Sequence, residues 1–416
     1  MLLLSKLFYF LMIISLVLSY EILLQRTEHE QIYSSDKDFT YDHIVCKLNN
    51  KLDVQNVCFY RNLFYNMEAS FMEGSNKDKS QKYKLSIDLL SPYSWIKSDI
   101  CKICTLSKKT NKTQCTSDCN MRNFNNTRKC NQENGCFITN KTGTLDFLEY
   151  QLKGKFISDS FKINDELMIN NFNFLSVEQV INAPFFYSDG AIGMIKDNLI
   201  GSNFFGSLKK VNDNIKEEIF SIYIREKENN ELSSYRPKII MGSIFEKYKK
   251  DETEFQFINV NKDSSIFWDL PITSITLDKK SQNSKKTVNF RNNHAFLTLD
   301  STFIALPNQE LIELLAILNE WFNNKCSLDE IKLNALFCSD LKQESLLEGV
   351  KIKFTFEGEK VVEVNPYMLL RDCKHENGKL DCFFNVHESF STSTILGEAF
   401  LKNFYSVFDY DHSKVS

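Results

Sequence analysis

Hydrophobic and polar residues alternate with a period of two along most of this chain, or form short apolar runs between polar breaks. That spacing puts every second side chain on one face of an extended segment, which is typical of β-strands. The segments predicted as strands are 83–87, 155–163, 219–224, 238–241, 254–260, 267–277, 295–299, 350–356 and 405–408. A broad apolar face over 308–322, directly after Pro307, predicts one strong helix, and 397–403 predicts a shorter one. The expected fold class is mostly β.

A short pattern occurs twice. Leu85-Ser-Ile-Asp88 recurs as Leu297-Thr-Leu-Asp300, and each copy is a strand-like run that ends in an aspartate. Further along, Gly190-Ala-Ile-Gly193 recurs as Thr394-Ile-Leu-Gly397, and each copy ends in a glycine. The repeated order predicts two related lobes that each supply one carboxylate, with a boundary in the charged stretch 246–254.

Composition and charge exclude several classes of protein and of binding partner. The chain has 416 residues, of which 43% are hydrophobic and 25% charged, so a disordered or collagen-like chain is excluded. This length predicts two domains. The formal net charge of −4, with both signs dispersed, offers no general attraction to nucleic acid or to an anionic membrane.

The N-terminal segment 1–19 has one lysine, an apolar stretch and a small residue at Ser19, which is the pattern of a signal peptide cleaved after Ser19. An uncleaved signal anchor and an apolar core helix are the alternatives. No later run reaches the ~18 apolar residues of a membrane span, so no span is expected in the mature chain. We expect a monomer in the secretory pathway, either secreted or in the lumen of the ER or a vacuole. Residues 20–59 form an N-terminal segment that could be a removable pro-region.

Twelve cysteines, an even number, agree with an oxidising compartment. Cys101-Lys-Ile-Cys104 could be half of a zinc site, but no second pair or histidine lies nearby, so disulfides are favoured and no metal or other cofactor is expected. The cysteines fall into three groups: Cys46 and Cys58; Cys101, Cys104, Cys115, Cys119, Cys130 and Cys136; and Cys326, Cys338, Cys373 and Cys382. We predict that the second and third groups each pair internally.

The cysteine-rich segment 99–144 is also rich in Asn, Lys and Thr. It carries three glycosylation acceptors, at Asn111, Asn125 and Asn140. It is therefore predicted to be a surface insert within the N-terminal lobe.

Two aspartates brought together at a lobe interface cannot both ionise easily, so one keeps a proton while the other stays charged. Such a pair can activate a water molecule: the charged member takes a proton as the water attacks a peptide carbonyl, and the protonated member donates one. Asp88 and Asp300 are the candidates. Taken singly, each could instead be an ordinary solvated position of a strand.

The segment from Leu85 to Ile96 resembles the first active-site segment of pepsin-like aspartic proteases, apolar-apolar-Asp-Thr-Gly-Ser-Ser-x-x-Trp-Val. The segment 297–307 resembles the second, apolar-apolar-Asp-Ser/Thr-Gly-Ser/Thr-Thr-Phe-x-x-x-Pro, and 395–409 resembles the C-terminal Ile-Leu-Gly-Asp pattern. The cysteine-rich insert is similar to that of the nepenthesin and plasmepsin-five branch.

The resemblance implies a bilobal fold with an interlobe cleft, an N-terminal lobe over 60–250 and a C-terminal lobe over 251–416. It also implies catalytic roles for Asp88 and Asp300, a peptide or protein in the cleft, and no cofactor. The supporting active-site residues that it implies are Ser91, Trp95, Ser301, Gly193 and Gly397.

Both motifs depart from the family pattern. Leu89 and Leu90 replace the hydroxyl residue and the glycine after Asp88, and the interval from Asp300 to Pro307 is two residues shorter than the pattern. Tyr150 is the candidate for the tyrosine of the family's flap, although an ordinary hairpin aromatic is the better interpretation. We therefore expect an inactive or impaired relative that binds peptide or protein in the cleft. The alternative is an active endopeptidase that uses an Asp88–Asp300 pair.

Overall fold

The structure is a computed structural model. It describes residues 20–23, 25–26, 65–71, 82–106, 113–119, 126–146, 151–163, 167–182, 188–196, 204–212, 215, 217–224, 237–244, 255–262, 266–280, 283–329, 334–342, 349–376, 379–389 and 391–416. The predicted signal peptide and the predicted lobe boundary at 246–254 lie outside these residues. Within them, no helix is long and apolar enough to cross a membrane.

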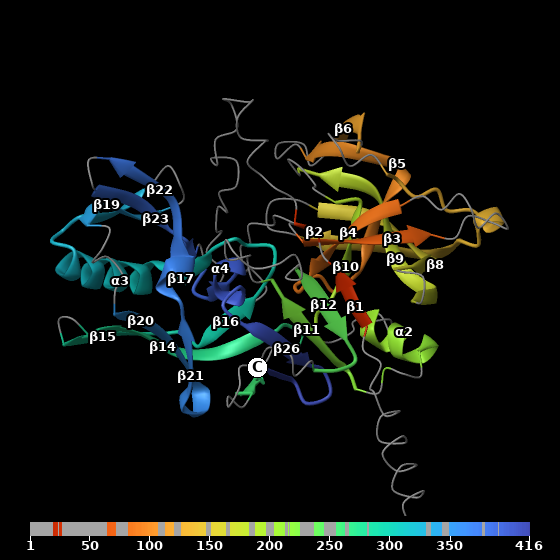
Figure 1. Cartoon of the computed structure of the whole chain (residues 1–416). Helices are drawn as coiled ribbons and strands as arrows, with labels where there is room; N and C mark the ends of the chain where they lie inside the picture. Colours follow the sequence, from red (N-terminus) through yellow and green to blue (C-terminus); the bar gives the residue numbers. More distant parts are fainter. Residues whose placement is uncertain are drawn as a thin grey trace, which may run out of the picture.

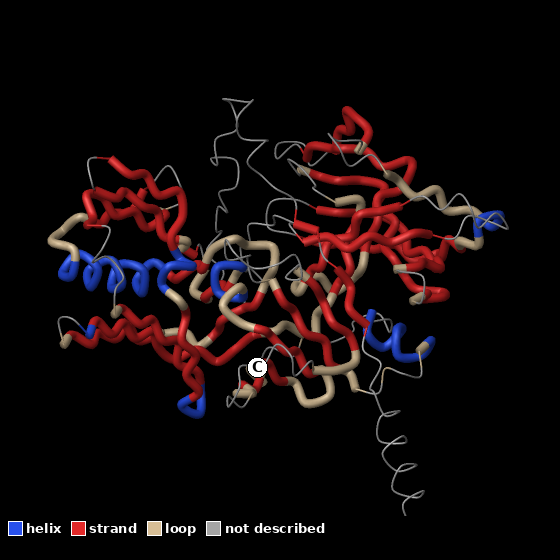
Figure 2. Tube along the Cα trace, in the orientation of Figure 1, coloured by secondary structure: helices blue, strands red, loops and turns tan. Residues whose placement is uncertain are grey.

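Strands dominate the described residues, as the sequence pattern predicts (Figure 2). One nine-stranded sheet forms the N-terminal lobe, on the right in Figure 1, and runs in the order β2-β3-β4-β10-β5-β9-β8-β7, with β6 paired to β5. Its strands are β2 (Gln25–Arg26), β3 (Tyr65–Phe71), β4 (Lys82–Asp88), β5 (Trp95–Leu106), β6 (Thr113–Asp118), β7 (Phe137–Asp146), β8 (Gln151–Lys162), β9 (Met168–Ile181) and β10 (Gly190–Gly193).

Two further sheets form the C-terminal lobe, on the left in Figure 1. The eight-stranded sheet contains β14 (Asp269–Lys279), β15 (Ser284–Asn289), β16 (His294–Leu297), β17 (Ile304–Pro307), β20 (Val350–Phe356), β21 (Lys360–Val364), β24 (Val386–Ser389) and β25 (Thr394–Leu396). The four-stranded sheet has the order β18-β19-β23-β22, with β18 (Cys326–Asp329), β19 (Ala335–Lys342), β22 (Leu370–Glu376) and β23 (Lys379–Phe384).

A six-stranded sheet connects the two lobes, because three of its strands come before the predicted lobe boundary along the chain and three come after it. Its order is β1-β12-β11-β26-β27-β13, and β11 pairs antiparallel with β26 near the C-terminus. The strands are β1 (Tyr20–Leu23), β11 (Ile219–Tyr223), β12 (Lys238–Met241), β13 (Ile258–Asn259), β26 (Tyr405–Asp409) and β27 (Lys414–Val415). The segment directly after the predicted signal peptide is therefore an edge strand of this sheet.

Few helices are present in the described residues. The α-helices are α2 (Phe204–Val211), α3 (Asn308–Trp321) and α4 (Glu398–Leu401), and the 3-10 helices are η3 (Gln132–Asn134), η8 (Glu357–Glu359) and η9 (Pro366–Leu369). The strong helix predicted after Pro307 is confirmed as α3, which buries Leu311, Leu314, Leu318 and Trp321. Helix α4 is shorter than the predicted 397–403, and α2 was not predicted.

Burial follows the sequence pattern. In β20, buried and half-buried residues alternate strictly, because only one face of this strand packs on the core. In β4 the alternation gives way to continuous burial from Leu85 to Asp88. The carboxyl end of β4 therefore lies deep inside the protein, where a charged residue needs specific hydrogen bonds.

Five disulfides confirm the predicted pairing of the second and third cysteine groups. They are Cys101–Cys119, Cys104–Cys115, Cys130–Cys136, Cys326–Cys338 and Cys373–Cys382. Cys46 and Cys58 lie outside the described residues. None of the bridges links the two lobes.

Candidate active site

Asp88 is the last residue of β4, and its side chain is fully buried. The backbone N–H groups of Leu90 and Ser91 both donate to its Oδ1 atom, each at 2.9 Å. Strand β10 runs parallel beside β4, so that Gly193 lies opposite Asp88. The turn that follows β4 thus fixes the orientation of the carboxylate through two charge-assisted hydrogen bonds.

The turn itself is held against Gly193. The Ser91 hydroxyl donates to the Tyr93 carbonyl oxygen at 2.8 Å, and the Gly193 N–H donates to the Ser94 hydroxyl at 3.1 Å. A Cβ atom on Gly193 would lie 2.5 Å from the Ser91 carbonyl oxygen, so only glycine fits there. Trp95 is buried at the start of β5. The structure therefore brings together the three predicted supporting residues of the first loop.

The second lobe repeats this arrangement with parallel strands β16 and β25. A Cβ atom on Gly397 would lie 2.4 Å from the Ser301 carbonyl oxygen and 2.3 Å from that of Phe303. The Ser301 hydroxyl donates to the Phe303 carbonyl oxygen at 3.1 Å. Ser301 and Gly397 therefore lie together in the second lobe.

The strand register assigns the position equivalent to Asp88 in the second lobe. In the first lobe, the glycine that ends β10 lies opposite Asp88. In the second lobe, Leu396 lies opposite Leu297, and the residue directly after β25 is the corresponding glycine, Gly397. Because the strands are parallel, the position that faces Gly397 is the residue after Leu297, which is Thr298.

Hydrogen bonds give the same alignment. The N–H group of Leu90 donates to Asp88 Oδ1 at 2.9 Å, and the N–H group of Asp300 donates to Thr298 Oγ1 at 3.0 Å. The Thr298 hydroxyl thus accepts the bond that the Asp88 carboxylate accepts in the first lobe, and Asp300 occupies the position of Leu90. The sequence repeat, which aligned Asp300 with Asp88, is shifted by two residues in the structure. A catalytic role for Asp300 stays a prediction.

The spacing along the chain agrees with this register. The second segment of the family pattern has Phe five positions and Pro nine positions after the aspartate. Phe303 and Pro307 lie five and nine positions after Thr298. Counted from Thr298, the segment has the full length of the pattern, so the shortening inferred from Asp300 disappears.

Each lobe has a leucine directly after the aligned residue: Leu89 follows Asp88, and Leu299 follows Thr298. Both leucines are almost completely buried and belong to the same apolar cluster, which extends through both lobes. In the family pattern this position is Thr or Ser. In this structure, apolar packing therefore fills this position in both lobes.

A chain of hydrogen bonds connects the two loops across the lobes. The Met194 N–H donates to the Asp88 carbonyl oxygen at 2.7 Å, and the Met194 carbonyl oxygen accepts from Trp268 Nε1 at 2.8 Å. The Trp268 carbonyl oxygen in turn accepts from the N–H of Leu297 in β16 at 3.0 Å. Buried Tyr410 also donates to the Met194 carbonyl oxygen, at 3.1 Å. The loops after β4 and β16 therefore have one defined relative position.

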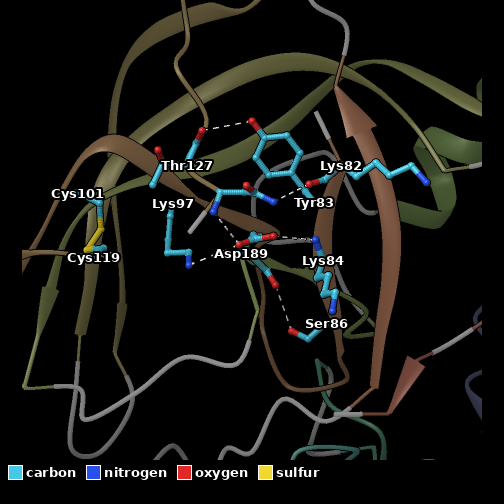
Figure 3. A network of polar contacts seen from close by, with 11 residues as sticks. Lys82, Tyr83, Lys84, Ser86, Lys97, Cys101, Cys119, Thr127 and Asp189 are labelled. Atoms are coloured by element: carbon cyan, nitrogen blue, oxygen red, sulfur yellow. Dashed lines mark hydrogen bonds and ion pairs between the residues drawn. A yellow bond between two sulfur atoms is a disulfide. The ribbon is translucent and has the colours of Figure 1, made fainter. Parts of the chain in front are cut away.

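Asp189, just before β10, is the centre of a buried polar network (Figure 3). Its Oδ2 atom accepts the Lys84 N–H at 2.9 Å, and its Oδ1 atom accepts the Asn126 N–H at 3.3 Å. The ammonium group of Lys97 lies 3.7 Å from Oδ1. Burial lowers the pKa of Lys97, and the Asp189 charge opposes that shift. Sequence reasoning missed Lys97, because a lysine in a strand normally marks a solvated position.

A second buried ion pair lies in the same lobe. Arg128 and Asp159 are each 1% exposed, and Arg128 Nε donates to Asp159 Oδ2 at 2.8 Å while Nη2 donates to Oδ1 at 3.3 Å. The guanidinium group also lies 5.0 Å from the centre of the Phe71 ring. Through Arg128, the cysteine-rich insert is attached to Asp159 of β8 in the main sheet.

Several predicted residues lie outside the described part of the chain, namely Tyr150, Asn111 and Asn125. Asn140 is exposed on β7, in a stretch where pairing with β8 is interrupted, so its side chain is open to glycosylation. Within the described ranges, no group of three His, Cys, Asp or Glu side chains is placed to hold a metal ion.

The close contacts at the two glycines lead to a stability prediction. Gly397 has a φ of −85°, which any residue adopts, so an added methyl group is penalised only by the two carbonyl oxygens beside it. We expect Gly397→Ala to lower the free energy of unfolding by about 1–3 kcal/mol, as overpacking does in other cores. Urea unfolding measures this change. Thr394→Ser, three residues earlier in β25, is the control, and equal stability of Gly397→Ala and the natural chain would contradict the prediction.

Comparison with known proteins agrees with this geometry. No curated protein matches the sequence. The family model described as eukaryotic aspartyl protease matches residues 74–416, which include both loops and the two sheets of the C-terminal lobe. The chain belongs to the eukaryotic aspartyl protease family.

Proposed function

We propose that this chain is a member of the aspartyl protease family that has lost efficient hydrolysis and binds a peptide or protein segment between its lobes. The observation that carries the proposal is the register of the second loop. Extended by one residue, the register of β16 with β25 puts Thr298 opposite Gly397, as Asp88 lies opposite Gly193, so the second lobe has a hydroxyl where the first lobe has a carboxylate.

The chemistry of this pair differs from that of two aspartates. Two carboxylates share one proton, so that one acts as base and the other as acid on the same water molecule. A threonine hydroxyl can donate and accept a hydrogen bond, but it does not ionise at acid pH and cannot take the proton from water. Loss of one general acid–base partner typically costs ~10²–10⁴-fold in rate.

The residues at the two glycine positions of the motifs support the same proposal. Leu90 and Asp300 occupy these positions, and their side chains are 3% and 0% exposed. In the family pattern only backbone lies there, next to the carboxylates. A side chain at a position where the family pattern has only backbone leaves less room for an attacking water and a scissile peptide.

An active endopeptidase is the second candidate, and one observation favours it. Asp300 is a fully buried acid two residues from Thr298, so the second loop still contains a carboxyl group. In that case Asp300 would act on the water from the position of the motif glycine, and both Asp88 and Asp300 would be essential.

Incubation with a randomised peptide library at acid pH distinguishes the two candidates. We expect the natural chain to retain a subset of intact peptides and to produce no new termini above those of Asp88→Ala. New termini that disappear in both Asp88→Ala and Asp300→Ala would instead establish the endopeptidase. Mass spectrometry of the bound and unbound peptides reads both outcomes in one experiment.

A further inference from the structure

The four cysteines of the C-terminal lobe lie in adjacent strands of the four-stranded sheet, whose strands β19, β22 and β23 are labelled above α3 in Figure 1. Cys326 of β18 faces Cys338 of β19, and Cys338 in turn faces Cys382 of β23. Residues that face each other on neighbouring strands have side chains on the same side of the sheet. Cys338 therefore has two possible partners, although its disulfide joins it to Cys326.

The fourth cysteine, Cys373, connects this row of facing cysteines (Cys326, Cys338 and Cys382) to the solvent. Cys373 lies on β22, the edge strand of the sheet, where it is exposed, and its disulfide joins it to Cys382. The other three cysteines are buried: Cys338 and Cys382 are 0% exposed and Cys326 is 7% exposed. A thiol from solvent can thus reach only the Cys373 end of the row.

The backbone ladder is interrupted beside these residues. The pairing of β22 with β23 shifts between Arg371 and Lys374, which places Cys373 in a bulge. The pairing of β19 with β23 shifts between Cys338 and Leu341. Residues in a bulge lack the regular ladder bonds, so fewer backbone hydrogen bonds fix the sulfur atoms on this side of Cys338.

We propose that these cysteines form a thiol–disulfide relay, in which an external thiol that attacks at the sheet edge releases a thiol at the opposite strand. The thiolate of the incoming thiol forms a bond to Cys373 Sγ, and the Cys373–Cys382 bond breaks with its electron pair on Cys382 Sγ. The Cys382 thiolate then attacks Cys338 Sγ. A Cys338–Cys382 bond forms, the Cys326–Cys338 bond breaks, and Cys326 leaves as a thiolate.

The relay conserves atoms, electrons and the number of disulfides. Before it, the sheet has two internal disulfides and the external thiol is free; after it, there is one mixed disulfide at Cys373, one Cys338–Cys382 bridge and one thiol at Cys326. Cys326 takes up the proton that the incoming thiol lost. The co-reactant is a small thiol or a protein dithiol of the secretory pathway. The result is a free thiol beside α3, where Asn319 Oδ1 accepts the Cys326 N–H at 2.8 Å.

Treatment of the folded, oxidised full chain with reduced glutathione tests the relay. The reaction is stopped with acid, free thiols are blocked with N-ethylmaleimide, and the peptides are mapped by mass spectrometry. We expect glutathione on Cys373, N-ethylmaleimide on Cys326, loss of the Cys326–Cys338 crosslink and a new Cys338–Cys382 crosslink. Glutathione on Cys373 with N-ethylmaleimide on Cys382 and an intact Cys326–Cys338 bridge would overturn the proposal.

A pair of double variants tests the geometry without any external thiol. Cys326→Ser with Cys373→Ser leaves Cys338 and Cys382, which face each other, and we expect them to form a bridge on oxidation. Cys326→Ser with Cys382→Ser leaves Cys338 and Cys373, which do not face each other, and we expect two free thiols. Free Cys338 and Cys382 thiols in a folded first variant would also overturn the proposal. The glutathione experiment on the natural chain decides the matter if a variant does not fold.

Discussion

A variant that restores the family pattern in both loops is expected to cleave peptides at acid pH, whereas the natural chain is not. Its five substitutions are Leu89→Thr, Leu90→Gly, Thr298→Asp, Leu299→Thr and Asp300→Gly. Together they place a carboxylate opposite Asp88, return hydroxyls to the two buried positions and remove the side chains beside the acids. We expect cleavage at least ~100-fold above the natural chain, the lower end of the gain from one positioned acid–base group.

A matched control isolates the new carboxylate. The same variant with Thr298→Asn in place of Thr298→Asp has nearly the same size and hydrogen-bonding ability at this position, but it has no ionisable group. We expect this control to remain inactive while it unfolds at the same urea concentration as the restored variant. Equal cleavage by the two variants, or a restored variant that folds but stays inactive, would contradict the register of Thr298 with Asp88.

Removal of Arg128 is expected to destabilise the protein severely. Asp159 is fully buried and accepts two hydrogen bonds from the guanidinium group, so Arg128→Met leaves a buried carboxylate without its counter-charge. Breaking one partner of such a pair typically lowers the free energy of unfolding by about 3–5 kcal/mol. The double variant Arg128→Met with Asp159→Leu removes both charges, and we expect its free energy of unfolding to fall much less. Urea unfolding with the disulfides intact measures both variants, and equal losses would show that the charge pair is not the cause.

The loss in Arg128→Met should depend on pH. Burial raises the pKa of Asp159, and the Arg128 guanidinium opposes that shift, so its removal raises the pKa of the folded state further. A carboxyl group whose pKa is higher in the folded state loses stabilisation as the pH rises from the unfolded pKa to the folded one. The deficit of the variant should therefore be small below about pH 4 and grow toward neutral pH. A deficit that is constant over this range would contradict this cause.

Much of the fold could be predicted, because it depends on local spacing. The period-two pattern predicts β4 and β20 directly, a short apolar run predicts β12, and Pro307 followed by an apolar face predicts α3. The pairing within the second and third cysteine groups was predictable because closing a short stretch of chain costs little entropy, but the individual pairs were not. Helix α2 was missed, because its eight residues are too few for a periodic signal to stand out from the surrounding strands.

The second loop could not be aligned from the sequence for a physical reason. Side chains on a strand alternate with a period of two, so a shift of two residues keeps every apolar residue on its original face. Both candidates therefore fit the pattern equally well, because Leu297 precedes Thr298 and Leu299 precedes Asp300. The only aspartate in the segment then decided the alignment, whereas the pairing of β16 with β25 favours the threonine. Buried Lys97 and Arg128 were missed because their partners, Asp189 and Asp159, are far away in the sequence.

The affinity for a statine-type transition-state mimic tests the central claim most directly, because the inhibitor hydroxyl has to bind two carboxylates at once and no substrate sequence needs to be known. Calorimetric titration at acid pH would compare the natural chain with Asp88→Ala and Asp300→Ala. With Thr298 opposite Asp88, we expect weak binding that changes by less than about tenfold in either variant. Tight binding by the natural chain that falls by ~100-fold or more in both variants would show that Asp88 and Asp300 form a working pair, and would contradict the account.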